Sequence, residues 1–173
     1  MHLDLATLES GLDGIRRAPA DDGKVELVIR RPATDEREVL TEARLDVDAG
    51  VVGDDWILDN PDTERQVTVM NARAIALVAV SRDRWALAGD QLYVDLDLSH
   101  ANLPAGTRLE VGSAVLEITA APHRGCKKFA ARFGVDALRF VNSKDGQALR
   151  LRGANARVVR GGVVRPGDII RKA

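Results

Sequence analysis

Short alternating segments separated by glycine turns constrain the fold of this chain more than any other feature. Residues 92–98 alternate apolar and polar side chains cleanly, which is typical of a half-buried strand. The pairs Gly112-Ser113 and Gly161-Gly162 supply tight turns between such segments. Further strands are expected at 24–30, 38–47, 66–70, 107–111, 114–119, 149–159, 163–164 and 169–171. Many short strands with regularly spaced glycine turns predict a mainly β protein built as a barrel or a sandwich.

A few short helices are expected between these strands. They are predicted at 3–15, from an N-cap at Asn71 to about Ser81, from Phe129 to a stop at Gly134, and at 135–142. The loop 50–56 contains two glycines and is interpreted as a plain connection. A chain of 173 residues is long enough for one domain, 1–173, in which 1–24 forms an N-terminal extension.

The composition limits where the protein acts and what it can hold. No apolar run approaches the ~20 residues that a membrane-spanning helix needs. Residues 1–5 lack the basic and apolar regions of a signal peptide, so a reducing cytoplasmic location is expected. The single cysteine excludes an internal disulfide and a cysteine-ligated iron–sulfur cluster within this chain.

That cysteine lies in the segment 122–129, which reads Pro-His-Arg-Gly-Cys-Lys-Lys-Phe. Its neighbours carry positive or titratable side chains: His123, Arg124, Lys127 and Lys128. Gly125 permits a sharp turn before Cys126, where a predicted strand ends and a predicted helix begins. These surroundings favour the thiolate, which is the nucleophilic and metal-binding form of cysteine. The alternative is a cysteine that packs as a small apolar side chain.

The charge of the chain changes sign at this motif. The segment 1–121 has a net charge of −11, whereas 122–173 has a net charge of +10. Such a division can hold two halves of one domain together, or it can build a positive pocket for an anionic ligand. Because the basic residues stand singly among apolar ones, and aromatic residues make up only 3% of the chain, we expect no nucleic-acid partner. In the absence of a long apolar run, no membrane partner is expected either.

Three familiar kinds of site are not expected from the residues. A zinc site needs about four ligands, and Cys126 and His123 are the only cysteine–histidine pair close in sequence. A cysteine hydrolase needs a remote base, and the candidate His100 has no evident orienting partner. No glycine cluster has the spacing of a phosphate-binding loop or a dinucleotide fingerprint.

An ordered set of motifs resembles the MOSC domain, the C-terminal domain of molybdenum cofactor sulfurases. The set begins with Gly106, Leu109, Gly112 and 116–119, continues through 122–129, and ends with 132–134, 152–154, Val158, 161–162 and 167–168. The match is clearest over 89–170 and looser upstream to about Val25, at 50–54 and 66–68. Gly125 stands where many family members carry proline, which is similar to a stand-alone bacterial-type member.

The resemblance implies a β-barrel with a few short helices and a site at Cys126. In the family this cysteine is associated with the molybdenum cofactor, as a thiolate ligand to the metal or as a carrier of sulfur. Cys126 and His123 are then the candidate catalytic residues, and Cys126 is the candidate metal ligand. Candidate cofactor-binding residues are Lys127, Lys128, Arg150 and Arg152, because a pterin phosphate needs positive side chains.

The same resemblance leaves the activity open between two possibilities. One is sulfur transfer, or reduction of N-hydroxylated compounds, on a bound molybdenum cofactor or a related sulfur-bearing anion. The other is a non-catalytic sulfur-carrier or ligand-binding domain. The chain has no room for the pyridoxal-phosphate domain of the full sulfurases, so sulfur or electrons would come from a donor or reductase protein.

Overall fold

Seven strands close into a barrel in the computed structural model, which describes residues 1–173. Around the barrel the order is β11 (Ile169–Lys172), β7 (Arg108–Val111), β8 (Ala114–Ile118), β9 (Ala154–Arg160), β5 (Val67–Asn71), β6 (Leu92–Asp95) and β1 (Gly23–Arg30). Pairing of β11 with β1 completes the ring, and only β5 and β6 run parallel. The expected mainly β barrel is confirmed.

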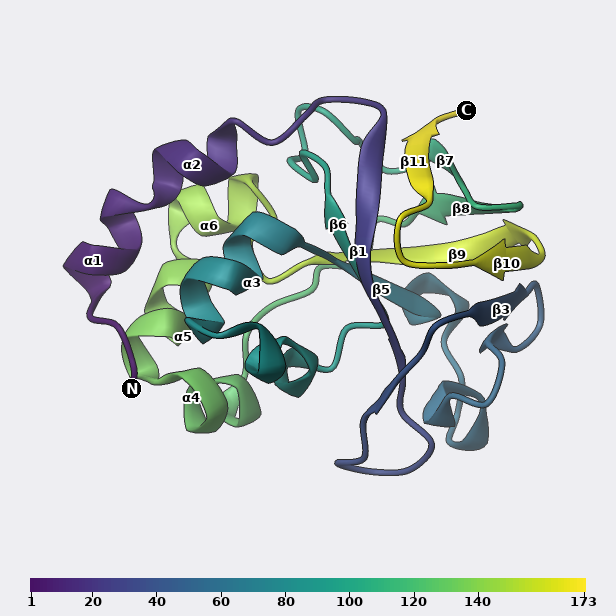
Figure 1. Cartoon of the computed structure of the whole chain (residues 1–173), viewed down its shortest axis with the longest axis horizontal. Coiled ribbons are helices and arrows are strands. Elements are labelled where there is room, and N and C mark those ends of the chain that lie inside the picture. Colours follow the sequence, from purple (N-terminus) through teal and green to yellow (C-terminus); the bar gives the residue numbers. More distant parts are fainter.

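A small second sheet extends from one end of the barrel. It contains β10 (Gly162–Val164), β3 (Ala43–Asp46) and β4 (Gly50–Val51), and it lies opposite the helices in Figure 1. The prediction of one continuous strand at 38–47 is wrong, because this segment forms two separate strands. Its first part, β2 (Glu38–Val39), pairs with β1, whereas β3 pairs with β10, so the chain changes sheets in between.

Six short helices cover the other side of the barrel, as Figure 1 shows. They are α1 (Leu5–Ser10), α2 (Leu12–Arg16), α3 (Ala72–Ala79), α4 (Lys127–Phe133), α5 (Val135–Asn142) and α6 (Lys144–Ala148). Short 3-10 helices lie at Asp55–Leu58, Thr63–Arg65 and Arg82–Ala88. The two predicted helices after the cysteine are confirmed as α4 and α5. None of the helices is long and apolar enough to cross a bilayer.

The strands serve two cores because their side chains alternate. Val69 and Leu92 belong to the cluster that fills the barrel, whereas their neighbours Met70 and Tyr93 belong to a second cluster under the helices. Phe129 of α4 is fully packed in this second cluster. The barrel wall therefore anchors the helix that follows Cys126.

Residues 149–153 form a buried turn, and the prediction of a strand there is wrong. Arg150 has φ of 51° and Gly153 has φ of 127°, and neither value is compatible with an extended strand. The strand β9 therefore begins only at Ala154. This turn decides where Arg150 and Arg152 point, because the two side chains no longer share one face of a strand.

Candidate functional site

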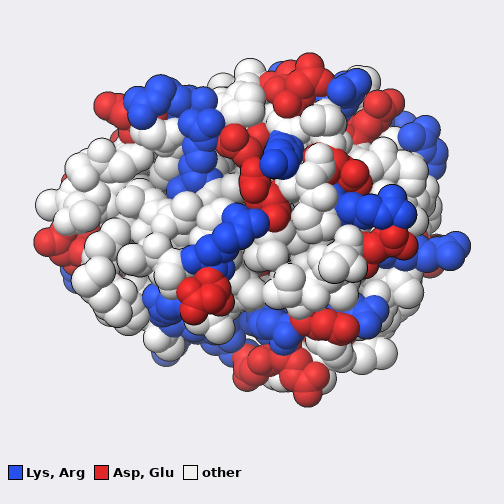
Figure 2. All heavy atoms as spheres, viewed as in Figure 1, with Lys and Arg blue, Asp and Glu red and all other residues white.

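Cys126 and His123 open onto a pocket of about 320 Å³ between the helices and the barrel. Its charged lining residues are Arg31, Arg37, Lys128, Arg132 and Arg152 together with Asp35 and Asp55. Basic side chains thus outnumber carboxylates in the lining by five to two. By contrast, basic and acidic side chains lie next to one another over the face of the molecule in Figure 2. The local excess of positive charge favours an anionic ligand.

Cys126 lies at the junction that the sequence predicted, directly before α4, and its side chain is exposed. The backbone N–H groups of Phe129 and Lys128 lower the pKa of the thiol, and Arg152 and Arg132 add to the effect. The thiolate is therefore more populated than in an ordinary surface cysteine.

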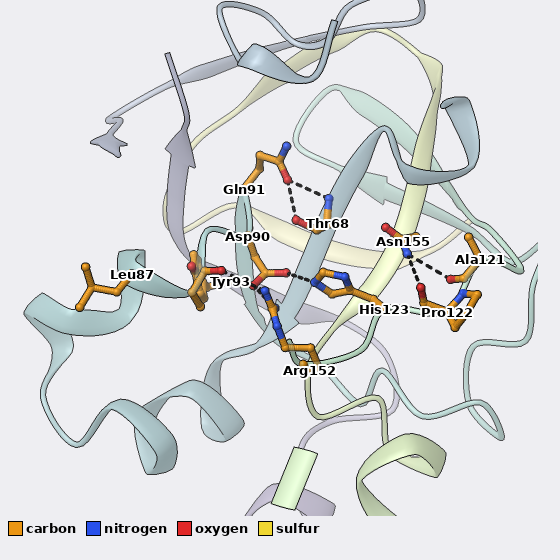
Figure 3. A network of polar contacts seen from close by, with 12 residues as sticks. Thr68, Leu87, Asp90, Gln91, Tyr93, Ala121, Pro122, His123, Arg152 and Asn155 are labelled. Atoms are coloured by element: carbon orange, nitrogen blue, oxygen red, sulfur yellow. Dashed lines mark hydrogen bonds and ion pairs between the residues drawn. The ribbon is translucent and has the colours of Figure 1, made fainter. Parts of the chain in front are cut away.

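The segment before Cys126 is held in place from two sides. The amide of Asn142 on α5 accepts a hydrogen bond of 2.9 Å from the Gly125 N–H and donates one of 3.0 Å to its carbonyl. From β9, the Asn155 Nδ2 donates to the carbonyls of Ala121 and Pro122 (Figure 3). A Cβ at Gly125 would lie 2.7 Å from Cδ1 of Leu138, so any larger residue at this position would displace the Leu138 side chain of α5.

His123 is oriented by a fully buried carboxylate. The Nε2 of His123 lies 3.1 Å from Asp90 Oδ1, and Asp90 Oδ2 accepts a 2.6 Å hydrogen bond from Arg152 (Figure 3). Burial raises the pKa of Asp90, but Arg152 and His123 outweigh this effect and lower that pKa to about 2. Since the ionised Asp90 only accepts, the proton of a neutral His123 lies on Nε2, and Nδ1 is left as an acceptor.

The surroundings of His123 favour its neutral form. Burial and the nearby Arg152 lower the pKa of the imidazole, and they outweigh Asp90, which raises it. Arg152 also donates to the carbonyl of Ala88 at 3.0 Å and lies 5.1 Å from the centre of the Phe129 ring. The chain Arg152–Asp90–His123 thus fixes a neutral imidazole at the wall of the Cys126 pocket.

Arg37 is the cation in this pocket that no carboxylate neutralises. Its Nε and Nη1 donate to the carbonyls of Ala86 and Glu36 at 3.1 and 2.9 Å. Burial, and then the charges of Arg132 and Arg31, lower the pKa of its guanidinium. Gly89, with φ of 85°, makes room for it, because a Cβ there would lie 2.8 Å from Nη2 of Arg37. An anion between these guanidinium groups would relieve their repulsion.

The other cations of the pocket have acidic partners. Arg31 forms a two-bond pair with the buried Asp54, at 3.2 and 2.8 Å. Asp35 lies 3.1 Å from Arg132 and 3.6 Å from Lys128. The loop 50–56 is therefore more than the predicted plain connection, because Asp54 orients Arg31 and Asp55 lines the pocket.

The structure brings together four of the six residues singled out from the sequence. Cys126, His123, Lys128 and Arg152 line one pocket. Lys127 is exposed and outside the lining, and Arg150 faces a separate cavity. The structure adds Arg31, Arg37, Asp90 and Arg132, none of which has a local sequence pattern that separates it from a solvated surface charge.

Comparisons with known proteins agree with this architecture. A family model for the MOSC domain matches residues 55–171. No curated protein matches the sequence. The fold is similar to that of the YUAD protein from Bacillus subtilis, with a TM-score of 0.62 and 17% identity over 86% of this chain and 93% of that one. It is also similar to YiiM from Escherichia coli, with a TM-score of 0.58 and 16% identity over 87% of this chain and 69% of that one.

YiiM from Geobacillus stearothermophilus gives a TM-score of 0.62 and 13% identity, over 87% of this chain and 75% of that one. At such identities these likenesses concern the fold alone. The family match establishes membership of a family, because it spans well over half of the chain. It includes His123, Cys126 and Arg152, which line the pocket, and Asp90, which contacts His123 and Arg152. The barrel, the cysteine at its rim and this match together place the chain in the MOSC domain family.

Proposed function

We propose that this MOSC domain binds the molybdenum cofactor in the Cys126 pocket and acts in sulfur transfer or in the reduction of N-hydroxylated compounds. The proposal rests on one observation above all. An exposed thiol with a lowered pKa opens onto a pocket in which basic side chains outnumber carboxylates by five to two. Such a pocket suits an anionic ligand that carries a soft metal or sulfur centre.

The donor set favours a metal that arrives with ligands of its own. No group of three or more His, Cys, Asp or Glu side chains is placed to hold a metal ion. The pocket thus offers a single soft ligand, the Cys126 thiolate, which suits a cofactor that already supplies the remaining ligands. When bound, the cofactor would supply the two-electron chemistry of molybdenum, for which this chain has no redox centre apart from Cys126.

The cations of the pocket fit the anionic part of such a ligand. Arg37 has N–H groups that no carboxylate occupies, and Arg132 and Lys128 share only Asp35. The volume of about 320 Å³ lies near the lower end of the range of about 300 to 1,000 Å³ for small-molecule sites. We therefore assign the anion to Arg37, with Lys128 and Arg132 beside it.

His123 is the residue for proton transfer in this proposal. Its Nε2–H is held by Asp90, so Nδ1 of the neutral ring can accept a proton and return it. Arg152 positions Asp90 and has little freedom to bind a ligand itself, because Asp90 and the Ala88 carbonyl occupy it. Electrons or sulfur would come from a partner protein, for which the exposed side chain of Cys126 is accessible.

A second candidate function, as a sulfur carrier, follows from the same exposure. The Cys126 thiolate would attack the outer sulfur of a donor persulfide, the donor thiolate would leave, and Cys126 would hold the transferred sulfur. Incubation with a persulfide donor should then add the mass of one sulfur atom to the intact protein. If Cys126→Ser gains the same mass, the sulfur is not carried at this residue.

Cofactor loading tests the main proposal directly. The wild type, Cys126→Ser, Arg37→Gln and the control Arg160→Gln would be expressed in a host that makes the cofactor. Arg160 is exposed and lies outside the pocket lining, so its variant matches the charge change of Arg37→Gln. Molybdenum and pterin are then measured per mole of protein.

We expect molybdenum in the wild type and in Arg160→Gln. Cys126→Ser should lose most of the molybdenum. Arg37→Gln should bind the cofactor about tenfold more weakly and therefore contain less of it, as expected for a lost charge-assisted hydrogen bond. Equal and negligible molybdenum in the wild type and in Cys126→Ser would contradict cofactor binding through Cys126.

A further inference from the structure

A second, smaller cavity of about 50 Å³ adjoins the Cys126 pocket, because His123 lines both. Its walls come from the loop after β8, from α5 and α6, from the turn before β9 and from His100. No lining residue carries a carboxylate, whereas Arg124 and Arg150 are both basic. The cavity is therefore surrounded by positive charge alone.

Arg150 is a buried guanidinium without a counter-charge. The residue is 8% exposed, and no ion pair involves it. Burial alone lowers the pKa of its guanidinium, with no carboxylate acting in the opposite direction. Buried arginines normally have an acidic partner, because removing a lone charge from water is costly. An anion in the cavity would supply the missing partner.

Arg150 lines this cavity and is held in place by two backbone carbonyls. Its Nη1 donates to the carbonyls of Leu98 and Leu103, at 3.0 and 2.6 Å, which keeps the side chain from swinging out. The hydrogen bonds of Arg150 to the protein use Nη1 alone, which leaves Nε and Nη2 without an acceptor. Because no fully buried side-chain nitrogen in the molecule lacks a partner, Nε and Nη2 are not completely enclosed, and Arg150 is one of the residues that line this cavity. Two neighbouring N–H groups of this kind bind two oxygens of one oxyanion.

The size of the cavity limits what can enter. A water molecule needs about 10 to 15 Å³ of such space, so 50 Å³ holds only a group of a few non-hydrogen atoms. A pterin or a nucleoside is too large, whereas a tetrahedral oxyanion fits. Arg124, which is exposed and forms no ion pair, stands at the wall of the cavity as a second cation.

We propose that this cavity is an oxyanion site, in which Nε and Nη2 of Arg150 bind one phosphate or sulfate group and Arg124 adds a second positive charge. The site is separate from the cofactor pocket and does not depend on the proposed function. Both His100 and His123 line it, so an anion there would lie beside both rings. A bound anion would therefore be detectable at these two histidines.

The test is an NMR titration of the histidine ring signals with inorganic phosphate at constant pH and low ionic strength. His2, the third histidine, lies outside the cavity and serves as an internal reference. The signals of His100 and His123 should shift and saturate with one affinity, and His2 should not follow them. Absence of a saturable shift at His100 would overturn the proposal, even if His123 responds to an anion in the Cys126 pocket.

Charge variants separate this site from general attraction of anions. Arg150→Gln should weaken phosphate binding by at least about tenfold, and Arg124→Gln by a few fold, whereas the matched control Arg160→Gln should not change it. If Arg150→Gln binds phosphate with the affinity of the wild type, the proposed site is wrong. If that variant does not fold, Arg124→Gln decides, and an affinity equal to that of the wild type then counts against the site.

Two further experiments identify the source of the oxyanion and test whether its binding stabilises the folded protein. Methyl phosphate that binds as well as phosphate indicates the terminal group of a larger molecule, and a preference for phosphate indicates the free ion; both results support the site. At about one hundred times Kd, phosphate should raise the Tm by about 5 to 10 °C. No molybdenum is used, so failure here leaves the test of the proposed function unaffected.

Discussion

Substitution of Asp90 by asparagine probes the most deeply buried charge of the Cys126 site. Asp90 is 0% exposed. Its Oδ2 accepts a hydrogen bond of 2.6 Å from Arg152, and its Oδ1 lies 3.1 Å from Nε2 of His123. Asparagine keeps the size of the side chain and removes its charge. Arg152 would then stay buried without a counter-charge, and its remaining partners would be the neutral amide oxygen of the asparagine, the Ala88 carbonyl and the Phe129 ring.

Two independent routes give the size of the effect. Breaking a buried ion pair by removing one partner costs about 3 to 5 kcal/mol, and the remaining contacts of Arg152 favour the lower end of that range. The pKa of Asp90 falls from 3.8 to about 2 on folding. At 1.36 kcal/mol per pKa unit, this shift corresponds to about 2 kcal/mol of stability at neutral pH. We expect Asp90→Asn to lose about 2 to 3 kcal/mol.

The pH dependence has a definite sign. Because the pKa of Asp90 is lower in the folded state, its contribution is complete above about pH 4 and is lost as the pH falls towards 2. The difference in unfolding free energy between the wild type and Asp90→Asn should thus be constant from pH 7 to 5 and should shrink below pH 4. Urea unfolding at these pH values measures it.

Asp83→Asn is the matched control for this prediction, because Asp83 is exposed and forms no ion pair. It should change the unfolding free energy by less than about 0.5 kcal/mol. The reasoning is refuted if Asp90→Asn costs under about 1 kcal/mol at pH 7, or if its deficit is as large at pH 3 as at pH 7.

Two further predictions concern the cysteine and the turn before β9. Cys126 should react with iodoacetamide with a midpoint below the pKa of about 8.5 of a free thiol, because backbone N–H groups stabilise its thiolate; a midpoint at or above that value contradicts this. Gly153→Ala should destabilise more than Gly167→Ala in thermal unfolding. Both glycines have positive φ, but a Cβ at Gly153 would lie 3.0 Å from the His123 ring, whereas one at Gly167 has no atom within 4 Å. Equal losses would refute the steric argument.

The barrel and the surroundings of Cys126 could be predicted because their signals are local. Alternation identifies strands such as β7 and β8, and the pair Gly112-Ser113 forms the turn between them. Gly134 ends α4 as expected, with φ of 97°. In each case neighbouring residues decide the conformation, so one sequence is sufficient.

The other half of the pocket could not be predicted in this way. Arg31, Arg37 and Asp90 reach Cys126 only through the closure of the barrel and the packing of loops on it. Arg150 and Arg152 show the difficulty most clearly, since they stand two positions apart and would share one face of a strand. The positive φ of Arg150 instead turns them to separate cavities.

The change of charge at Pro122 has the first of the two consequences that the sequence left open. Arg132 and Arg152 pair with Asp35 and Asp90 of the acidic part, so the division does hold the two halves together. A paired cation, however, attracts a ligand weakly, because its partner cancels its field. In the proposed function, the anion would therefore bind mainly to Arg37, the one cation of the Cys126 pocket without a carboxylate partner, which comes from the acidic part of the chain. Net charge along this sequence thus indicates where ion pairs form, whereas the proposed anion site depends on a charge that is left unpaired.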